Sequence, residues 1–142
     1  MRGVSDERSV FYRSLRDQLR AYAEREFKLS ATDDDGISYR KALEGLLKRA
    51  RDPKTRARYE SELTVPAFPK VLDYLWRVFL RLSRRRGSTG FGVAPISWSD
   101  IDAFVRNSGF TLAPWEVGIV EDLDDLFRAS LSIGKKKPDD ED

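Results

Sequence analysis

Apolar residues recur at helical spacing along most of the chain. Within residues 6–27 they fall about four positions apart and trace one stripe, which predicts an amphipathic helix. Residues 1–5 precede the stripe and are expected to form a loose terminus. The polar segment 30–36, SATDDDG, indicates a linker, and a second stripe over residues 37–50 predicts the next helix.

Prolines mark the expected ends of helices in the middle of the chain. Asp52 followed by Pro53 is typical of a helix start, and predicts a short polar helix over residues 53–63. Pro66 and Pro69 then interrupt regular structure, because proline lacks a backbone donor and restricts its predecessor. Residues 69–83 carry the broadest apolar face, which predicts a core helix.

The next segment, RRRGSTGFGVAP over residues 84–95, contains three glycines and a proline and predicts a flexible basic loop. Ser97 and Asp100 then have the spacing of a helix start, and Gly109 is placed to end that helix. We expect its inner face to be formed by the following residues: Trp98, Ile101, Phe104 and Val105. Pro114 is placed to begin a last helix over residues 114–131.

These elements predict an all-α fold, a small bundle of five to six helices with a flexible Gly/Arg-rich loop, because no segment alternates apolar and polar residues long enough for a strand. The expected organisation has three parts. Residues 1–62 form an amphipathic helical N-terminal extension, residues 63–134 form a helical core, and residues 135–142, KKKPDDED, form a disordered charged tail.

The 142-residue chain contains no cysteine and no histidine. Zinc sites built on thiolates or imidazoles are therefore excluded, as are Cys-His and Ser-His-Asp nucleophilic sites. The GSTGFG stretch lacks the Lys and Ser/Thr of a phosphate-binding loop. The acidic residues 121–125 are interpreted as a solvated helix face. We therefore expect no catalytic residue, no cofactor, no metal and no enzymatic activity.

Charge is distributed unevenly although the net charge is only +2. Residues 63–97 hold six Lys or Arg against one acid, whereas residues 98–134 hold two Arg against seven acids. We expect the two segments to attract each other within the fold or between subunits. No apolar segment is long enough for a signal peptide or a membrane span. That pattern and the lack of cysteine fit an intracellular protein.

Two features are compatible with nucleic-acid binding. The two helices around Gly109 have helix-turn-helix spacing, but the second helix is acidic and would repel a duplex, so an ordinary helical hairpin is favoured. The run Arg84, Arg85 and Arg86 would suit phosphate or an acidic partner. A solvated loop after a helix C-terminus is the favoured interpretation of that run.

Three tryptophans within forty residues are further candidates for contacts with a partner, because Trp is enriched in interface hot spots. We expect two of them in the core and one, Trp115 at a helix start, partly exposed. The residues proposed to bind a partner are Trp76, Phe79, Arg84, Arg85, Arg86, Phe91, Trp98 and Trp115.

Several unusual sequence blocks follow one another in a fixed order. LWRVFLRLS is followed by the glycine-rich loop, then by PISWSDIDAF, LAPWEV and LDDLF, over residues 75–127. This order resembles the small tail assembly chaperones encoded in the tail modules of long-tailed phages and prophages. The resemblance does not extend to the residues before about position 63, so the role of that part is left open.

The resemblance implies a binding protein without catalytic function in the host cytoplasm. Its partners would be the tape-measure protein, which is a very long helical chain, and the major tail (tube) protein that assembles around it; a homo-oligomer is compatible with this role. Such a protein needs apolar grooves that accept amphipathic helices. No membrane partner is expected.

Two alternatives stay open. One is a structural tail or head-completion protein that remains in the virion. The other is a small nucleic-acid-associated phage protein that uses Arg77, Arg81 and the run from Arg84 to Arg86, although nucleic acid is the less favoured partner because the acidic last third would oppose it.

Overall fold

A computed structural model describes residues 2–88, 90 and 92–133, and this part of the chain is all-α, as predicted. Two isolated bridges, Thr32 with Ser38 and Ser88 with Val93, are the only β pairing among these residues. The elements are α1 (Arg2–Ser30), α2 (Tyr39–Arg49), α3 (Pro53–Leu63), the 3-10 turn η1 (Lys70–Leu72), α4 (Asp73–Ser83), α5 (Trp98–Ser108) and α6 (Pro114–Ile133).

The predicted helix starts are confirmed where a polar cap marks them. Ser97 accepts a hydrogen bond from the backbone N–H of Asp100, and the Asp100 carboxylate accepts one from the N–H of Ser97, which together form a capping box. Gly109 ends α5 with a φ of 80°. Asp52 caps α3 by accepting from the N–H of Thr55.

Other boundaries differ from the prediction. The expected loose terminus over residues 1–5 is wrong for residues 2–5, which already belong to α1. The second helix begins at Tyr39 because Ser38 caps it. Pro69 is followed by η1, and the core helix proper starts at Asp73. The predicted disordered tail, residues 135–142, lies outside the described residues.

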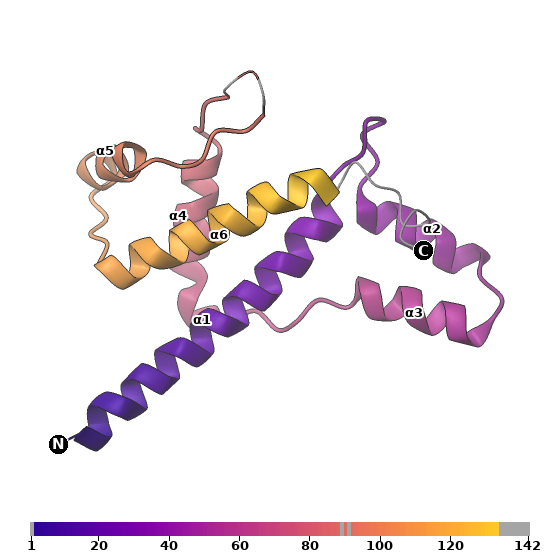
Figure 1. Cartoon of the computed structure of the whole chain (residues 1–142), viewed down its shortest axis with the longest axis horizontal. Helices are drawn as coiled ribbons and strands as arrows, with labels where there is room; N and C mark the ends of the chain where they lie inside the picture. The colour runs from indigo at the N-terminus through magenta and orange to yellow at the C-terminus, as the bar shows by residue number, and fades with distance from the viewer. Residues whose placement is uncertain (1, 89, 91, 134–142) are drawn as a thin grey trace.

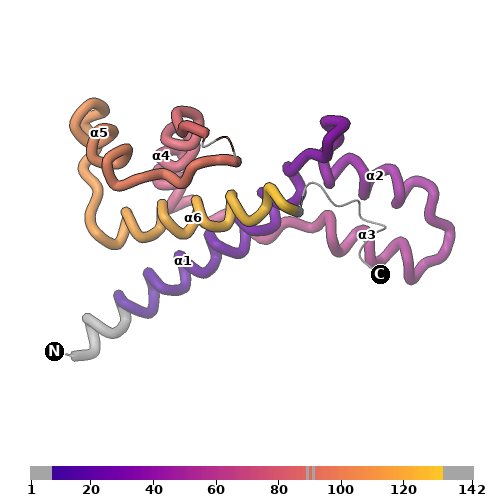
Figure 2. The backbone as a smooth tube through the Cα atoms, turned by 45° about the horizontal axis from the view of Figure 1, so that its top comes forward, coloured from indigo at the N-terminus to yellow at the C-terminus, as the bar shows by residue number. Residues whose placement is uncertain are grey.

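The long helix α1 organises the molecule. Its 29 residues span about 43 Å. Figures 1 and 2 show α6 lying along α1, with α4 and α5 on one side of this pair and the α2–α3 hairpin at the opposite end of the molecule. The second half of α1 therefore contacts both groups of helices, since Leu19 and Phe27 pack with α4 and α6 and Leu29 packs with the hairpin.

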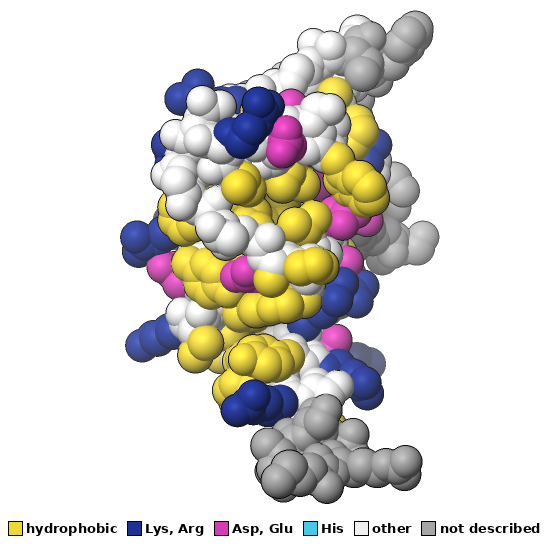
Figure 3. All heavy atoms as spheres, turned by 90° about the vertical axis from the view of Figure 1, so that its left-hand side faces the viewer, with side chains coloured by type: hydrophobic (Ala, Val, Ile, Leu, Met, Phe, Trp, Pro, Cys, Tyr) yellow, Lys and Arg dark blue, Asp and Glu magenta, His cyan; other side chains and the backbone are white. Residues whose placement is uncertain are grey.

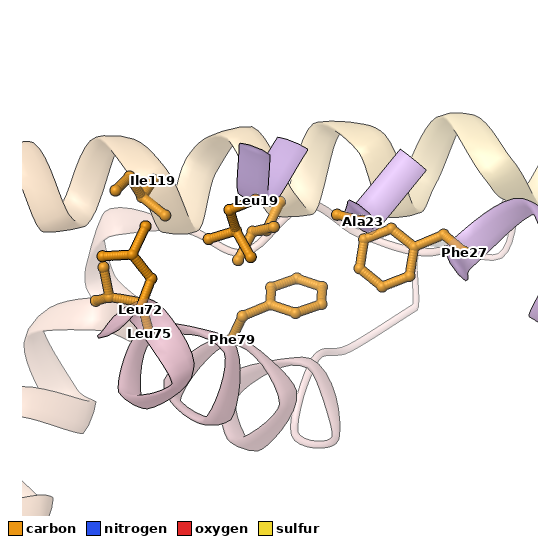
Figure 4. Close-up of a cluster of buried hydrophobic side chains, with 8 residues drawn as sticks. Leu19, Ala23, Phe27, Leu72, Leu75, Phe79 and Ile119 are labelled. Carbon is orange, nitrogen blue, oxygen red and sulfur yellow. The ribbon is translucent and has the colours of Figure 1, made fainter. Parts of the chain in front are cut away.

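The main core lies where α1, α4 and α6 meet. Figure 4 shows Leu19, Ala23 and Phe27 of α1 facing Phe79 of α4 and Ile119 of α6. The whole cluster is Leu19, Ala23, Phe27, Leu72, Leu75, Phe79, Ile119 and Leu123. Apart from Ala23, each of these side chains contributes roughly 1.5–3 kcal/mol when it leaves water, before entropy is subtracted.

Two smaller clusters complete the interior. One fixes α5 against α4 and α6, and consists of Val78, Leu82, Ile101 and Val120. The other holds the α2–α3 hairpin against the end of α1, and consists of Leu29, Tyr39, Leu43 and Tyr59. Packing thus does not follow the predicted division at residues 62 and 63, since α1 belongs to the same core as α4 and α6.

Candidate functional site

Exposed apolar side chains gather at one end of the molecule. Six of the eight large hydrophobic side chains that are exposed in the described residues lie at the beginnings of α1, α5 and α6 or in the turn between α5 and α6. We call this surface the apolar end; its members are Val10, Phe11, Tyr12, Trp98, Phe110 and Trp115. Figure 3 views the molecule from this side and shows hydrophobic side chains gathered across it. Apolar surface of this kind marks interaction sites in proteins.

A groove runs between α5 and α6 at the apolar end. It has a volume of about 430 Å³. Its walls are mainly apolar, and its charged members are both acidic. The lining residues are Trp98, Ile101, Asp102, Val105, Leu112, Pro114, Val117 and Glu121. We call it the α5–α6 groove.

A second groove, the α1–α6 groove, lies on another face of α6 and has a volume of about 410 Å³. Its charged members are both basic, in contrast to the first groove. It is lined by Ser9, Tyr12, Arg13, Arg16, Trp115 and Ile119. The rings of Tyr12 and Trp115 lie with centroids 5.3 Å apart. The start of α6 therefore separates two apolar grooves whose charged members have opposite signs.

The start of α6 is held in place by Glu116. One carboxylate oxygen accepts a hydrogen bond from the N–H of Ala113, at 2.8 Å, which caps the helix. The other accepts a hydrogen bond from the hydroxyl of Tyr74 in α4. Burial raises the pKa of Tyr74 well above its ordinary value, and the hydrogen bond and negative charge of Glu116 add to that effect. Both grooves are lined by residues of α6, so these hydrogen bonds hold one wall of each groove in place.

An ion pair fixes α1 to α6 beside the α1–α6 groove. Arg16 Nη2 lies 2.6 Å from Asp122 Oδ2, and its Nε donates to the same oxygen at 2.7 Å. The guanidinium passes close to Gly118, where an added Cβ would meet Arg16 Nη2 at 3.6 Å. An alanine would be in ordinary contact at that distance, whereas a larger side chain would displace the arginine.

A buried ion pair joins the basic and acidic segments of the chain. Arg86 Nη1 lies 2.6 Å from Asp124 Oδ1, and the two side chains are 7% and 5% exposed. Asp124 Oδ2 accepts a hydrogen bond from the N–H of Ile96, so one carboxylate holds both ends of the glycine-rich segment. The predicted attraction between the two segments is confirmed within the fold.

The same contact corrects two interpretations. Asp124 does not belong to a solvated acidic face, because it is buried beneath the glycine-rich segment. Arg86 is not part of a solvated basic run, because its guanidinium also donates to Ser83 Oγ and to the carbonyl of Ala94 and lies over the ring of Phe127. Spacing alone did not indicate this pairing, because the partners are far apart in the sequence.

Two predicted partner-binding residues, Trp76 and Phe79, belong to the main core or pack against it. Phe79 is 1% exposed and belongs to the main core. Trp76 is partly buried and stacks on Phe27 at 5.3 Å, in an aromatic group that also includes Tyr22, Phe68 and Phe127. Both residues stabilise the packing of α1, α4 and α6, and neither belongs to the apolar end.

The remaining predicted residues are distributed over the surface. Arg84 and Arg85 are exposed, and Arg85 lines a mixed groove between α4 and α5 together with Arg81 and Phe104. Phe91 lies outside the described residues. Only Trp98 and Trp115 of the predicted set meet at the apolar end.

Trp98 differs from its predicted position. It was expected on the inner face of α5, but it is 74% exposed, whereas Ile101 one turn later is buried. Trp98 is the first residue of α5, so no preceding turn of its own helix covers it. Trp115 is 41% exposed, in agreement with the prediction for that residue.

Sequence reasoning missed four members of the apolar end. Val10 and Phe11 were assigned to the stripe of α1, and the signal that distinguishes them is that they lie before the first buried residue of that stripe. Tyr12 fell outside the stripe. Phe110 directly follows the helix-ending Gly109, and its ring stacks on Phe104 at 5.9 Å.

Within residues 2–88, 90 and 92–133, no group of three or more carboxylates is arranged to hold a metal ion. In that same part of the chain, no helix has the length and apolar character required to cross a bilayer. The fold and the site thus define a small all-helical protein with an exposed, grooved apolar end.

The comparison with protein families gives this class a name. A model described as phage tail assembly chaperone matches residues 53–129, more than half of the chain. The chain therefore belongs to the phage tail assembly chaperone family. No curated protein and no solved structure gives a significant match.

The family match confirms the resemblance seen in the sequence and extends it toward the N-terminus. It covers α3, η1, α4, α5 and most of α6, which includes the α5–α6 groove and Trp115. Helix α1 lies outside the match although it supplies Leu19, Ala23 and Phe27 to the main core. The α1–α6 groove thus lies between α6, which the family model matches, and α1, which it does not match.

Proposed function

We propose that this chain binds the tape-measure protein through its apolar end and keeps it soluble until tail-tube subunits assemble around it. The observation that carries the proposal is the gathering of six exposed large hydrophobic side chains around the start of α6. The family assignment supports a role in tail assembly. The protein would act in the host cytoplasm, by binding and without catalysis.

The form of the apolar end suits a helical partner. An amphipathic helix presents apolar anchors at positions i, i+3 or i+4 and i+7, which an elongated apolar groove accepts. Trp98 and Trp115 offer large, amphipathic contact surfaces on the two sides of the α6 start. One charged member of each groove is already in an ion pair, Arg16 with Asp122 and Asp102 with Arg106, and the other members, Arg13 and Glu121, have opposite signs. Helices with different flanking residues therefore find a complementary site.

Nucleic-acid binding receives less support from the same surface. Arg86 is committed to Asp124, which removes one cation from the basic run. Arg77 pairs with Asp73 on α4 at 2.7 Å, and such an exposed pair lowers the net positive charge of that helix. At the apolar end, Arg13 and Arg16 line the α1–α6 groove, but Arg16 is paired with Asp122.

The test is co-expression of the full chain with the tape-measure protein encoded in the same tail module. We expect the tape-measure protein in the soluble fraction, in a complex detected by affinity capture and light scattering. The double variant Tyr12→Ala/Trp115→Ala opens the α1–α6 groove and should return most of the tape-measure protein to the pellet. The matched control is Val71→Ala, another exposed apolar residue that lies outside the apolar end.

An insoluble tape-measure protein beside the wild-type chain would reject the proposal. So would equal solubilisation by the wild type and the double variant, because binding would then not depend on the apolar end. Mass spectrometry of purified particles separates this role from that of a virion component. A stoichiometric amount of the chain in mature particles would favour the latter.

A further inference from the structure

We infer that the mixed groove between α4 and α5 binds an acidic segment of a partner protein, with Arg81 and Arg85 as its anion-binding residues. We call it the α4–α5 groove. Its volume is about 400 Å³, which falls in the range of roughly 300–1,000 Å³ for ligand sites. It shares no lining residue with the α5–α6 groove and lies on a different face of α5. The inference does not rest on tape-measure binding at the apolar end.

Helix α4 and the turn after it carry a row of arginines, and the last two have no counterion. Arg77, Arg81 and Arg85 stand four positions apart, and Arg77 pairs with Asp73 one turn earlier at 2.7 Å. Both neighbours of Arg81 in this row are arginines, and like charges at this spacing are unfavourable. Among the described residues, neither Arg81 nor Arg85 forms an ion pair. An acidic ligand would relieve this repulsion.

The guanidinium of Arg81 is held over an aromatic ring. Its Cζ atom lies 5.4 Å from the centroid of the Phe104 ring. The ring of Phe110 stacks on Phe104 with centroids 5.9 Å apart, so the ring beneath the arginine is itself supported. A guanidinium that is already oriented loses less side-chain freedom when a carboxylate binds to its N–H groups.

The other lining residues suit a peptide side chain that ends in a carboxylate. Leu82 and Ala103 provide apolar surface for the methylene groups of a Glu. Ser108 Oγ accepts a hydrogen bond from the N–H of Phe110 at 3.2 Å, which leaves its hydroxyl proton for donation. The groove thus combines two cations, a hydroxyl donor and apolar walls.

The spacing of the two arginines further defines the ligand. Residues four positions apart on a helix have Cβ atoms about 5–6 Å apart. A helical segment with Asp or Glu at positions i and i+4 therefore matches Arg81 and Arg85 together. A nucleic-acid duplex fits less well, because its backbone carries a charge about every 1.7 Å and would pass beside Asp100, which also lines the groove.

The test measures binding of a labelled, alanine-rich helical peptide to the full chain by fluorescence anisotropy. The acidic probe carries Glu at positions i and i+4, and the neutral probe carries Gln at both. We expect saturable binding of the acidic probe with a Kd below about 1 mM, which weakens as salt is added. The neutral probe should bind at least about tenfold more weakly, because it makes no charge-assisted hydrogen bond.

Substitutions locate the site. Arg81→Gln/Arg85→Gln should weaken binding of the acidic probe by at least about tenfold. Arg49→Gln/Arg51→Gln is the matched control, because it removes two exposed arginines from the hairpin, at the opposite end of the molecule. The control should bind within about twofold of the wild type, since salt screens charges at that distance. All four positions are exposed, so the fold should be retained, and circular dichroism checks this.

A double-mutant cycle tests the role of the aromatic ring. Phe104→Leu removes the ring beneath Arg81 but keeps an apolar side chain. It should weaken binding of the acidic probe by about twofold to fivefold in the wild type, and by less when Arg81 is already Gln. A purely structural role of Phe104 would give the same factor in both backgrounds.

A charge reversal provides a gain of function. Arg81→Glu/Arg85→Glu should lose the acidic probe and bind a probe with Lys at positions i and i+4. Such an exchange of preference does not follow from local unfolding of the groove, which would abolish binding of both probes.

Four results would overturn the inference. The first is no preference for the acidic over the neutral probe up to about 1 mM, and the second is unchanged binding in Arg81→Gln/Arg85→Gln. The third is tighter binding of a mixed-sequence DNA duplex, which would assign the groove to nucleic acid.

The fourth concerns the acidic end of the chain itself, residues 139–142 with the sequence DDED. If the acidic probe binds only after these residues are neutralised to Asn and Gln, the groove belongs to that segment and not to a partner. None of the four results bears on tape-measure binding, which is read out in the co-expression experiment.

Discussion

The α2–α3 hairpin is stabilised by contacts between residues that are close in sequence, whereas the body of the molecule is stabilised by contacts between residues that are far apart. The body consists of α4, α5, α6 and the adjoining part of α1. The hairpin buries Leu29, Tyr39, Leu43 and Tyr59, which are neighbours within one short stretch of sequence. The body unites Leu19 with Leu123, at nearly opposite ends of the chain. Helix α1 thus supports both a local unit and a long-range one.

The two regions also differ in their polar contacts. The hairpin is fixed by partly exposed arginines: Arg40 pairs with Glu26, and Arg56 donates to the carbonyls of Leu47 and Ala50. The body contains the buried pair of Arg86 and Asp124. We therefore expect single substitutions to cost more in the body than in the hairpin.

The largest effect is expected from Asp124→Asn, which leaves the buried charge of Arg86 without a counterion. The free energy of unfolding should fall by about 3–5 kcal/mol, measured by urea denaturation. The control Asp125→Asn changes the exposed neighbouring carboxylate and should alter stability by less than about 0.5 kcal/mol. Equal effects of the two substitutions would show that the ion pair is not buried in solution.

Two cavity-forming substitutions, one in the hairpin and one in the body, test whether the hairpin opens independently of the rest of the molecule. Leu43→Ala and Leu123→Ala each remove a fully buried side chain and should cost roughly 2–5 kcal/mol in the region that contains the cavity. Hydrogen exchange should show that Leu43→Ala lowers protection in α2 and α3 only, whereas Leu123→Ala lowers it in α1, α4 and α6. Loss of protection throughout the chain in both variants would reject the division.

Tyr74→Phe removes the hydrogen bond to Glu116 and should cost about 1.5–3 kcal/mol at neutral pH. The raised pKa of Tyr74 also sets a pH dependence. The unfolded chain loses the proton near pH 10 while the folded chain keeps it, so stability is full below pH 10 and falls as the pH rises above it.

Denaturation at pH 9 and pH 11 checks this prediction. The wild type should lose more stability between these values than Tyr74→Phe does. A wild-type loss no greater than that of Tyr74→Phe would contradict the assignment to Tyr74.

The smallest effect is expected from Arg40→Met, which breaks the partly exposed pair that joins the hairpin to α1. The cost should be about 0.2–1 kcal/mol and should decrease at high salt. Arg77→Met is the matched control, because it breaks an exposed pair within one helix. A cost well above 1 kcal/mol for Arg40→Met would mean that the hairpin depends on this ion pair more than on its apolar cluster.

The sequence predicted the elements well wherever the signal is local. Ser97 with Asp100, Gly109 and Pro114 mark helix ends through their own backbone chemistry, so α5 and the start of α6 were located correctly. The same holds for Asp52 and Pro53 at the start of α3. Such caps act within four residues and require no knowledge of the tertiary fold.

The candidate site was only partly predictable. Trp98 and Trp115 were singled out, but of the other aromatic candidates Phe79 lies in the interior and Trp76 is partly buried against the main core. An aromatic residue on a helix is exposed or buried according to which other helix covers it, and this depends on contacts far away in the sequence. The pairing of Arg86 with Asp124 could not be predicted for the same reason. Each residue stands in a run of like charges in the sequence, and such runs usually lie in solvent.

The pairing of α1 with α6 has a consequence for synthesis on the ribosome. Leu19 emerges early, but its partners Ile119 and Leu123 are made roughly 100 residues later, which takes on the order of 5–20 s. The hairpin can close over the end of α1 meanwhile, because all its members are already made. Until α6 appears, the part of the α1 stripe that packs against Ile119 and Leu123 is uncovered, so the newly synthesised chain passes through an interval in which it is prone to aggregate.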